Sequence, residues 1–223
     1  MRVVLSVGGS MVNPKGKPDL GFLRSLAKLI RKSKNSFGIL VGGGSMARVY
    51  ANAARQLGAS EYDADNIAIM ETRQNAALVI AALSDAGVDV HQSVLTDFEQ
   101  GKQLRNKVVV MGGTIPGITT DTDSVLLAEV MGAKRLVNIS NVQAIYDKDP
   151  RKNRNAKKFA RMTYDQLVSL AADSDKRKAG THFVFDMLAC KLIARSKIEA
   201  HFVSKKDMEK AIEGKKHNGT VVS

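Results

Sequence analysis

One stretch of sequence decides the fold, Phe37-Gly38-Ile39-Leu40-Val41-Gly42-Gly43-Gly44-Ser45, in which an apolar run meets three glycines and then a helical pattern. A shorter version stands at the start of the chain, where residues 3–7 precede Gly8-Gly9-Ser10. A strand that ends in a glycine loop before a helix lets backbone N–H groups approach a phosphate unobstructed by side chains. One such loop is weak evidence, but two predict a site for several phosphates and point to a phosphotransfer enzyme.

The rest of the chain alternates continuous apolar runs with amphipathic segments. Continuous apolar runs are typical of strands buried on both faces of a parallel sheet, and amphipathic segments predict the helices that cover those faces. We therefore expect an α/β fold, a three-layer αβα sandwich with a mainly parallel central sheet. The predicted strands span residues 3–7, 37–41, 88–94, 108–111, 135–140, 199–203 and 219–222, the last of them at a sheet edge.

The amphipathic segments define the helices and their caps. The predicted helices span residues 19–34, 45–56, 65–86, 121–131, 164–172, 183–196 and 207–213, with a short one from 97. Ser45 is placed to cap the helix of residues 45–56, and Thr120 or Asp121 to cap the helix of residues 121–131. Gly87 is placed to end the helix of residues 65–86. The polar, basic stretch between residues 141 and 161 predicts an excursion or a small hairpin.

Length and composition are typical of a single enzyme domain. A chain of 223 residues, 44% of them hydrophobic, can bury a large core, and we expect two lobes, 1–137 and 138–223, to form the sides of a cleft. No apolar stretch approaches the roughly 20 residues of a membrane span, and the N-terminal run is too short for a signal peptide. The single cysteine, Cys190, excludes an internal disulfide and favours a cytoplasmic location with a buried thiol.

The charge is concentrated in the second half of the chain. Residues 1–100 carry a net charge of +2 and residues 101–223 carry +10, with seven basic residues between 148 and 161. A basic surface attracts polyanions, which include free nucleotides as well as RNA. The stretch has only Phe159 to stack on bases, so an RNA-binding face is the less favoured alternative and no specific nucleic acid partner is expected.

Several common site patterns do not account for the glycine loops. Gly42, Gly44 and Ala47 satisfy the loose G-x-G-x-x-A spacing of a dinucleotide fold. The acids about twenty residues on, Asp63 and Asp65, lie at the start of a predicted helix rather than at the end of a strand. The sequence holds no Walker motif, and its four histidines lack zinc-ligand spacing, so no resident metal is predicted.

A specific set of motifs occurs in a fixed order along the chain. The motifs are Val7-Gly8-Gly9-Ser10, Val41-Gly42-Gly43-Gly44 with Arg48, Gly112-Gly113-Thr114-x-Pro116-Gly117-x-Thr119-Thr120-Asp121, Asn141-Val142-x-x-x-Tyr146-x-x-Asp149-Pro150 and Asp186-x-x-Ala189-x-Lys191. This ordered set resembles the amino acid kinase superfamily, and within it the archaeal-type uridylate (UMP) kinases, over essentially the whole chain.

The resemblance implies transfer of the ATP γ-phosphate to UMP in pyrimidine nucleotide biosynthesis, with Mg²⁺ carried by ATP and a homohexamer built from dimers. The helix predicted at 65–86 is the candidate interface. The ATP-binding residues that it implies are Gly8, Gly9, Ser10, Gly44, Arg48, Ser140, Asn141, Tyr146 and Asp149. The implied UMP-binding residues are Gly43, Asp65, Gly113, Thr114, Ile115, Pro116, Gly117, Ile118, Thr119 and Thr120.

Particular residues make chemical sense in these roles. Arg48, one turn into its helix, could reach phosphates at the helix N-terminus. Asp65 would accept the ribose hydroxyls of UMP, or else cap its helix, or do both. A phosphate acceptor is already anionic, so no general base is needed and catalysis is alignment plus electrostatic stabilisation.

The sequence departs from the superfamily in places. In most members a lysine precedes the first glycine pair, whereas this chain has Ser6 at that position. The archaeal uridylate kinases, which the chain resembles, also lack that lysine. Arg48 or Lys191 is then the candidate cation that compensates for it. Gln143-Ala144 replaces the usual Asp-Gly. Two alternatives stay open, namely a non-catalytic nucleotide- or RNA-binding regulator and a relative that acts on another phosphate acceptor.

Overall fold

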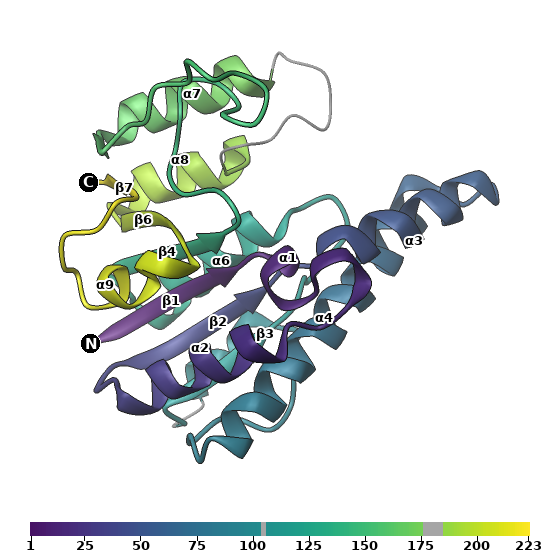
Figure 1. Ribbon diagram of the computed structural model, residues 1–223. Helices are drawn as coiled ribbons and strands as arrows, with labels where there is room; N and C mark the ends of the chain where they lie inside the picture. Colours follow the sequence, from purple (N-terminus) through teal and green to yellow (C-terminus); the bar gives the residue numbers. More distant parts are fainter. Residues whose placement is uncertain (104–105, 176–184) are drawn as a thin grey trace.

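The central sheet organises the molecule, a computed structural model that describes residues 1–103, 106–175 and 185–223 (Figure 1). Within these ranges the sheet has seven strands in the order β3-β2-β1-β4-β6-β7-β5. The strands are β1 (Arg2–Val7), β2 (Ser36–Val41), β3 (Val108–Met111), β4 (Arg135–Ser140), β5 (Arg161–Met162), β6 (Glu199–Ser204) and β7 (Thr220–Val222). Every neighbouring pair is parallel except β6 and β7, so the predicted mainly parallel sheet is confirmed.

Helices cover both faces of this sheet (Figure 1). The side chains of β1 alternate between the faces: Val3, Leu5 and Val7 pack under the helices of one face, while Val4 packs under those of the other. The first face carries α2 (Leu20–Lys32), α4 (Glu61–Asp85) and α9 (Met208–Ile212), and the second carries α5 (Phe98–Gln103), α6 (Thr120–Met131), α7 (Tyr164–Asp175) and α8 (Met187–Ser196). The three-layer αβα sandwich is thus confirmed. No helix in the described ranges has the length and apolar character needed to cross a membrane.

The chain order places a switch point in the middle of the sheet. The chain runs outward from β1 through β2 to β3 and then returns to β4, which pairs with the opposite edge of β1. The loops that follow β1 and β4 therefore diverge at their carboxyl ends, which is where open parallel sheets bind ligands. The short helices α1 (Gly9–Val12) and η1 (Pro14–Gly16) follow β1 there, and α3 (Gly44–Gln56) follows β2.

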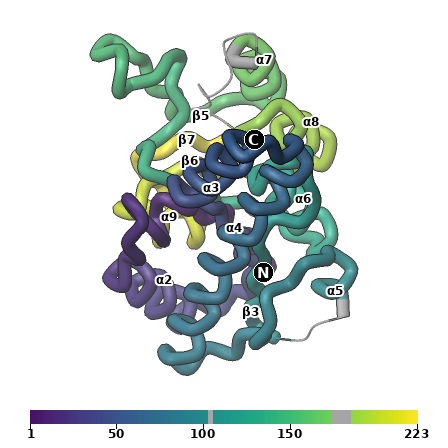
Figure 2. The backbone as a smooth tube through the Cα atoms, turned by 90° about the vertical axis from the view of Figure 1, so that its right-hand side faces the viewer, coloured from purple at the N-terminus to yellow at the C-terminus, as the bar shows by residue number. Residues whose placement is uncertain are grey.

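Two strand predictions are corrected. Residues 88–94 form no strand; they contribute an isolated parallel bridge between Val90 and Val108, and Leu95 contributes a second to Met111. The final strand, β7, lies between β6 and β5 rather than at the edge, because the chain after the hairpin adds β5 outside it. The predicted hairpin is present, with Tyr146 and Lys158 paired as an antiparallel bridge. Figure 2 shows this segment as a green loop that projects from the sandwich.

Several helix starts differ from the predictions. Ser60 caps α4 by accepting the Asp63 N–H at 3.2 Å, so the helix begins four residues before Asp65 and that residue is not its cap. The helix α3 begins at Gly44 without a side-chain cap, and α6 is capped by Thr119. Neighbouring hydroxyl and acidic residues are all good caps, so the sequence does not choose among them. The helix predicted from 183 begins at Met187, and its predicted start lies outside the described residues; the 3₁₀ turn η2 (Lys205–Asp207) precedes α9.

Candidate active site

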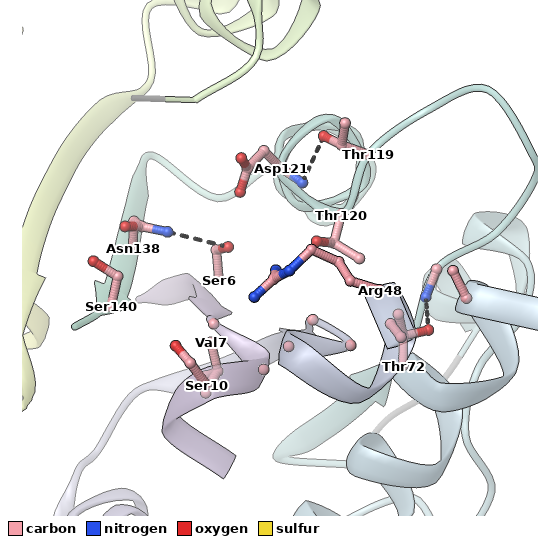
Figure 3. A pocket seen from close by; sticks show the side chains of 18 of the residues that line it. Ser6, Val7, Ser10, Arg48, Thr72, Thr119, Thr120, Asp121, Asn138 and Ser140 are labelled. Atoms are coloured by element: carbon pink, nitrogen blue, oxygen red, sulfur yellow. Dashed lines mark hydrogen bonds between the residues drawn. The ribbon is translucent and has the colours of Figure 1, made fainter. Parts of the chain in front are cut away.

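A cavity of about 790 Å³ lies at the carboxyl ends of β1, β2 and β4, at the switch point of the sheet (Figure 3). Its walls come from both glycine loops, from α4, from the loop before α6 and from the chain after β4. The predicted site residues that line it are Gly8, Gly9, Ser10, Gly43, Gly44, Arg48, Asp65, Gly113, Ile118, Thr119, Thr120, Ser140 and Asn141. The predicted residues outside its lining are Thr114, Ile115, Pro116, Gly117, Tyr146, Asp149 and Lys191.

The two glycine loops touch through their backbones. A Cβ atom built on Gly9 would overlap the backbone of Gly42, Gly43 and Gly44, and a Cβ on Gly44 would overlap that of Gly9. Gly44 also has a φ of 71°, a conformation that favours glycine. Only glycine at positions 9 and 44 therefore allows this approach, which sets the first turns of α1 and α3 side by side at the cavity.

The donors at these loops are not all free. The Gly8 N–H donates to the Ile139 carbonyl at 3.0 Å, and the Gly42 N–H donates to the Val7 carbonyl at 2.9 Å. These bonds continue the sheet, so the predicted role of Gly8 as a phosphate donor does not fit its N–H in this structure. The first N–H groups of α3, by contrast, have no partners within the helix and carry its positive dipole end. The N-terminus of α3 is therefore suited to an anion.

Arg48 brings a positive charge into the cavity. Its side chain extends from the first turns of α3 to lie between Ser6 and Thr120 (Figure 3). Ser6 occupies the floor, where its hydroxyl is 3.4 Å from the Asn138 amide nitrogen. The guanidinium thus reaches the region in which a first-strand lysine is missing.

One face of α4 holds both the second glycine loop and the loop before α6. Asn75 is buried and donates to the Gly42 carbonyl at 3.0 Å and to the Gly43 carbonyl at 3.3 Å. Thr72 accepts the Gly113 N–H at 2.7 Å. The sequence analysis missed Asn75 and Thr72, which hold the loops that line the cavity. The available signal was a polar side chain at a buried position on a helix face that is otherwise largely apolar.

Two further contacts tie the loop before α6 to α4. Arg73 donates to the carbonyls of Gly113 and Thr114, each at 3.2 Å. Asp65 accepts the Gly117 N–H at 2.9 Å through one carboxylate oxygen. Although Thr114 and Gly117 do not line the cavity, these bonds to α4 hold the loop that does.

Three carboxylates gather where α6 meets α8. Asp186 accepts hydrogen bonds from the hydroxyls of Thr119, at 2.5 Å, and Thr122, at 3.0 Å. Burial, with the nearby charge of Asp186, raises the pKa of Asp121 to about 7. Burial raises the pKa of Asp123 to about 6, against two hydrogen bonds from Thr114 that lower it. Asp121 also lines the cavity, so its charge at the site changes near neutral pH.

Arg151 is a second cation at the cavity, which the sequence analysis did not single out. Its backbone N–H donates to Asp149 Oδ1 at 3.0 Å, and its Nε lies 3.4 Å from the same oxygen. Lys191, predicted alongside Arg48 as a candidate compensating cation, is exposed on α8. Among the described lining residues, the positive side chains are therefore Arg48 and Arg151.

Comparisons with known proteins agree with this architecture. The model of the amino acid kinase family matches residues 1–204. A curated uridylate kinase of Thermococcus kodakarensis is 43% identical over 100% of this chain and 99% of its own length, and one of Archaeoglobus fulgidus is 40% identical over all of both. The crystal structure of uridylate kinase from Archaeoglobus fulgidus has a TM-score of 0.87 at 38% identity over the whole of both chains. A UMP kinase from Bacillus anthracis, 21% identical over 100% of this chain and 95% of its own, shares the fold with a TM-score of 0.82. The chain belongs to the amino acid kinase family.

Proposed function

We infer that this chain is a UMP kinase, a phosphotransferase that moves the γ-phosphate of ATP to UMP and releases UDP and ADP. The observation that carries this conclusion is identity of 40–43% to curated uridylate kinases over the whole chain. The geometry agrees, because two glycine loops and two arginines converge on one cavity at the switch point. A place in pyrimidine nucleotide biosynthesis is part of this proposal.

We propose that UMP binds on the α4 side of the cavity. Asp65 would accept the ribose hydroxyls, since a carboxylate that accepts one N–H, here from Gly117, keeps further acceptor positions. The loop of residues 113–120 would surround the uracil, with Gly43 near the acceptor phosphate. The contacts of α4 with this loop support the proposal, since they hold the loop in place before any ligand arrives.

We propose that ATP binds on the other side, between the glycine loops and the chain after β4. Gly9, Ser10 and Gly44 would donate backbone N–H groups to the phosphates, and Ser140 and Asn141 line the cavity beyond them. Tyr146 and Asp149 would serve adenine and ribose from the hairpin; they stand outside the lining and stay predictions.

The proposed chemistry needs no proton transfer. The UMP phosphate is already anionic, so the protein has to align it with ATP and stabilise the charge that develops on the transferred group. Arg48 and Arg151 are the cations that line the cavity, and we propose that they replace the lysine absent at Ser6. Lys191 stands outside the lining, and its contribution stays a prediction.

The lining suits a magnesium ion that arrives with the nucleotide. Mg²⁺ keeps several waters and commonly binds through one or two carboxylates plus substrate phosphates. Asp65 and Asp121 line the cavity, and no group of three potential ligands able to hold a metal occurs in the described ranges. When bound, Mg²⁺ would neutralise phosphate charge. Asp121 is the carboxylate we propose to face it, because we assign the remaining acceptor positions of Asp65 to the UMP ribose.

We also propose a cytoplasmic homo-oligomer, a hexamer built from dimers. Large apolar side chains are exposed along α3 and α4: Leu57 is 87% exposed, Tyr62 65% and Met70 59%. Burial of such side chains favours association. Light scattering after size exclusion measures the mass, and Leu57→Glu should reduce it. We propose further that the lobes of 1–137 and 138–223 bind UMP and ATP respectively.

The test of the proposed function is an ADP-release assay with ATP and Mg²⁺. The acceptors compared are UMP, CMP, dUMP, AMP, isopentenyl phosphate and acetylglutamate. Turnover that depends on UMP is the expected result. Turnover with another acceptor alone would identify a different kinase of the family. Absence of turnover together with tight, salt-sensitive RNA binding would identify a regulator instead.

A further inference from the structure

The hydroxyl of Thr220 joins the two arms of the hairpin at its base. Thr220 is fully buried on β7. Its Oγ1 accepts the Ile145 N–H at 2.9 Å and donates to the Phe159 carbonyl at 2.5 Å. Ile145 and Phe159 begin and end the hairpin, and the Phe159 N–H donates to the Ile145 carbonyl at 3.0 Å.

This arrangement replaces one bond of an ordinary antiparallel pair. Two directly opposed residues can exchange both N–H···O bonds. Ile145 and Phe159 exchange only one, and the Thr220 hydroxyl stands between the other donor and acceptor, which it satisfies together. A hydroxyl is suited to this place because it donates and accepts at once. The base of the hairpin is therefore set by a side chain from another strand.

The hairpin base leads directly to the cavity. On one side, Asn141 and Val142, which line it, precede Ile145 by only a few residues. On the other, the hairpin carries Arg151, held against Asp149 at its tip. The next pairs continue the hairpin, since the Asp147 N–H donates to the Lys157 carbonyl at 3.0 Å. A change in the angle at the base would therefore move Arg151 relative to the glycine loops.

We propose that Thr220 is a positioning residue for the ATP phosphates, acting through the hairpin that presents Arg151. The inference rests on the proposed function in taking ATP as the phosphate donor. Thr220 itself does not line the cavity; on β7 it pairs with Phe202 of β6, a lining residue on the β4 side of the sheet, away from α4. Its loss should therefore weaken the use of ATP and leave the use of UMP nearly unchanged.

The experiment compares Thr220→Val, Thr220→Ser and Val222→Ala with the unaltered protein. Valine keeps the shape and removes the hydroxyl, and serine keeps the hydroxyl. Val222→Ala removes buried side-chain volume from the same strand and leaves the Thr220 hydroxyl in place. Kinetics give KM for ATP and for UMP separately, calorimetry gives the Kd for ATP without UMP, and thermal melting gives Tm.

Thr220→Val removes both hydrogen bonds at the hairpin base. It should raise KM and Kd for ATP about threefold to tenfold, a change comparable to the net contribution of one of these bonds, with KM for UMP unchanged. Thr220→Ser should keep KM and Kd for ATP close to those of the unaltered protein. Val222→Ala should lower Tm and leave the Kd for ATP unchanged. If valine leaves the Kd for ATP unaltered, or if Val222→Ala raises it equally at a similar Tm, the proposal is overturned. If the protein binds ATP but does not turn over UMP, the UMP kinase assignment is refuted. The role of Thr220 can still be tested in that case, because the Kd for ATP is measured without UMP.

Discussion

Asp65 and Gly117 are joined by one hydrogen bond at 2.9 Å, across 52 residues of sequence. The bond fastens the outer part of the loop of residues 113–120 to the first half of α4. It also changes the interpretation of Asp65, because the cap of α4 is Ser60. A carboxylate has about four acceptor positions, so this bond leaves room for ribose hydroxyls on the cavity side.

Asp65→Asn should raise KM for UMP and leave KM for ATP near its original value. The amide has one acceptor oxygen instead of two, so it cannot hold both the Gly117 N–H and the ribose as well. The loss should be smaller with dUMP, which already lacks one hydroxyl. Comparison of both substrates on both proteins measures this coupling. Equal losses for UMP and dUMP would contradict the ribose assignment.

Ser60→Ala is the matched control for that experiment. It removes the cap of α4 one turn away and should lower stability by about 1 kcal/mol. Because Ser60 does not line the cavity, both KM values should stay unchanged. Urea denaturation of the two variants then separates a ligand effect from a helix effect.

Arg48→Ala should reduce kcat/KM about 10- to 100-fold, since a charge-assisted contact to phosphate contributes about 1.5–3 kcal/mol. The side chain is exposed, so the melting temperature should barely change. Arg31→Ala, an exposed arginine on α2, supplies the control for a change of net charge. Full activity in the Arg48 variant would remove this residue from the site.

Asp121→Asn should stabilise the unliganded protein at pH 8 while it lowers activity. Burial and Asp186 raise the pKa of Asp121 to about 7, above the value near 4 of the unfolded chain. The folded protein therefore disfavours the ionised form of Asp121. The resulting loss of folding stability grows as pH rises from about 4 to about 7 and is constant above that. The variant should gain no more than about 4 kcal/mol at pH 8 and nothing at pH 4. Denaturation curves at both pH values give the difference, and a gain independent of pH would contradict it.

His201 and His217 form a short chain of hydrogen bonds beside β7. The Gly219 N–H donates to His217 Nδ1 at 3.0 Å, His217 Nε2 and His201 Nδ1 are 2.8 Å apart, and His201 Nε2 lies 2.9 Å from Glu199. Each imidazole fits this chain in its neutral form, with one donor and one acceptor nitrogen. Burial lowers the pKa of both, against the carboxylate of Glu199 that raises that of His201.

Stability should consequently fall as pH drops from 7 to 5. The unfolded chain takes up protons on both histidines near pH 6.5, whereas the folded chain resists them until lower pH. His217→Gln should reduce this loss by on the order of 1 kcal/mol, and His91→Gln, outside the chain of bonds, should not. Urea denaturation at the two pH values measures it; identical losses in all three proteins would exclude the pair as the cause.

The strand and helix order could be predicted from the sequence because it depends on local apolar patterns. Residues 88–94 show the limit of that method. Their apolar pattern matches a strand. They nevertheless pair with the neighbouring strand β3 only through an isolated bridge at Val90, and Leu95 just beyond them makes a second. Whether an apolar run completes a ladder depends on the path of its neighbour, which no local pattern contains.

The parts of the site that depend on backbone geometry could be predicted, because glycines mark them in the sequence. The parts that depend on side chains brought in from distant segments could not. Gly9 and Gly44 are informative because no other residue allows their contact. Arg151 lies in a basic stretch in which every cation looks alike in sequence. Its place depends on the hairpin and on its contact with Asp149, which no local pattern contains. Lys191 fails to reach the cavity because α8 directs it to solvent.

The contact between Gly9 and Gly44 has a consequence for the entropy of the reaction. Where donor and acceptor sites are aligned by long side chains, each turnover has to restrict rotamers that were free, at a cost of up to about 2 kcal/mol for each side chain. Here two segments of bare backbone meet, and neither has a χ angle to restrict. If the two proposed phosphate sites lie at these loops, we expect their alignment to be built during folding, so that substrate binding does not have to supply it.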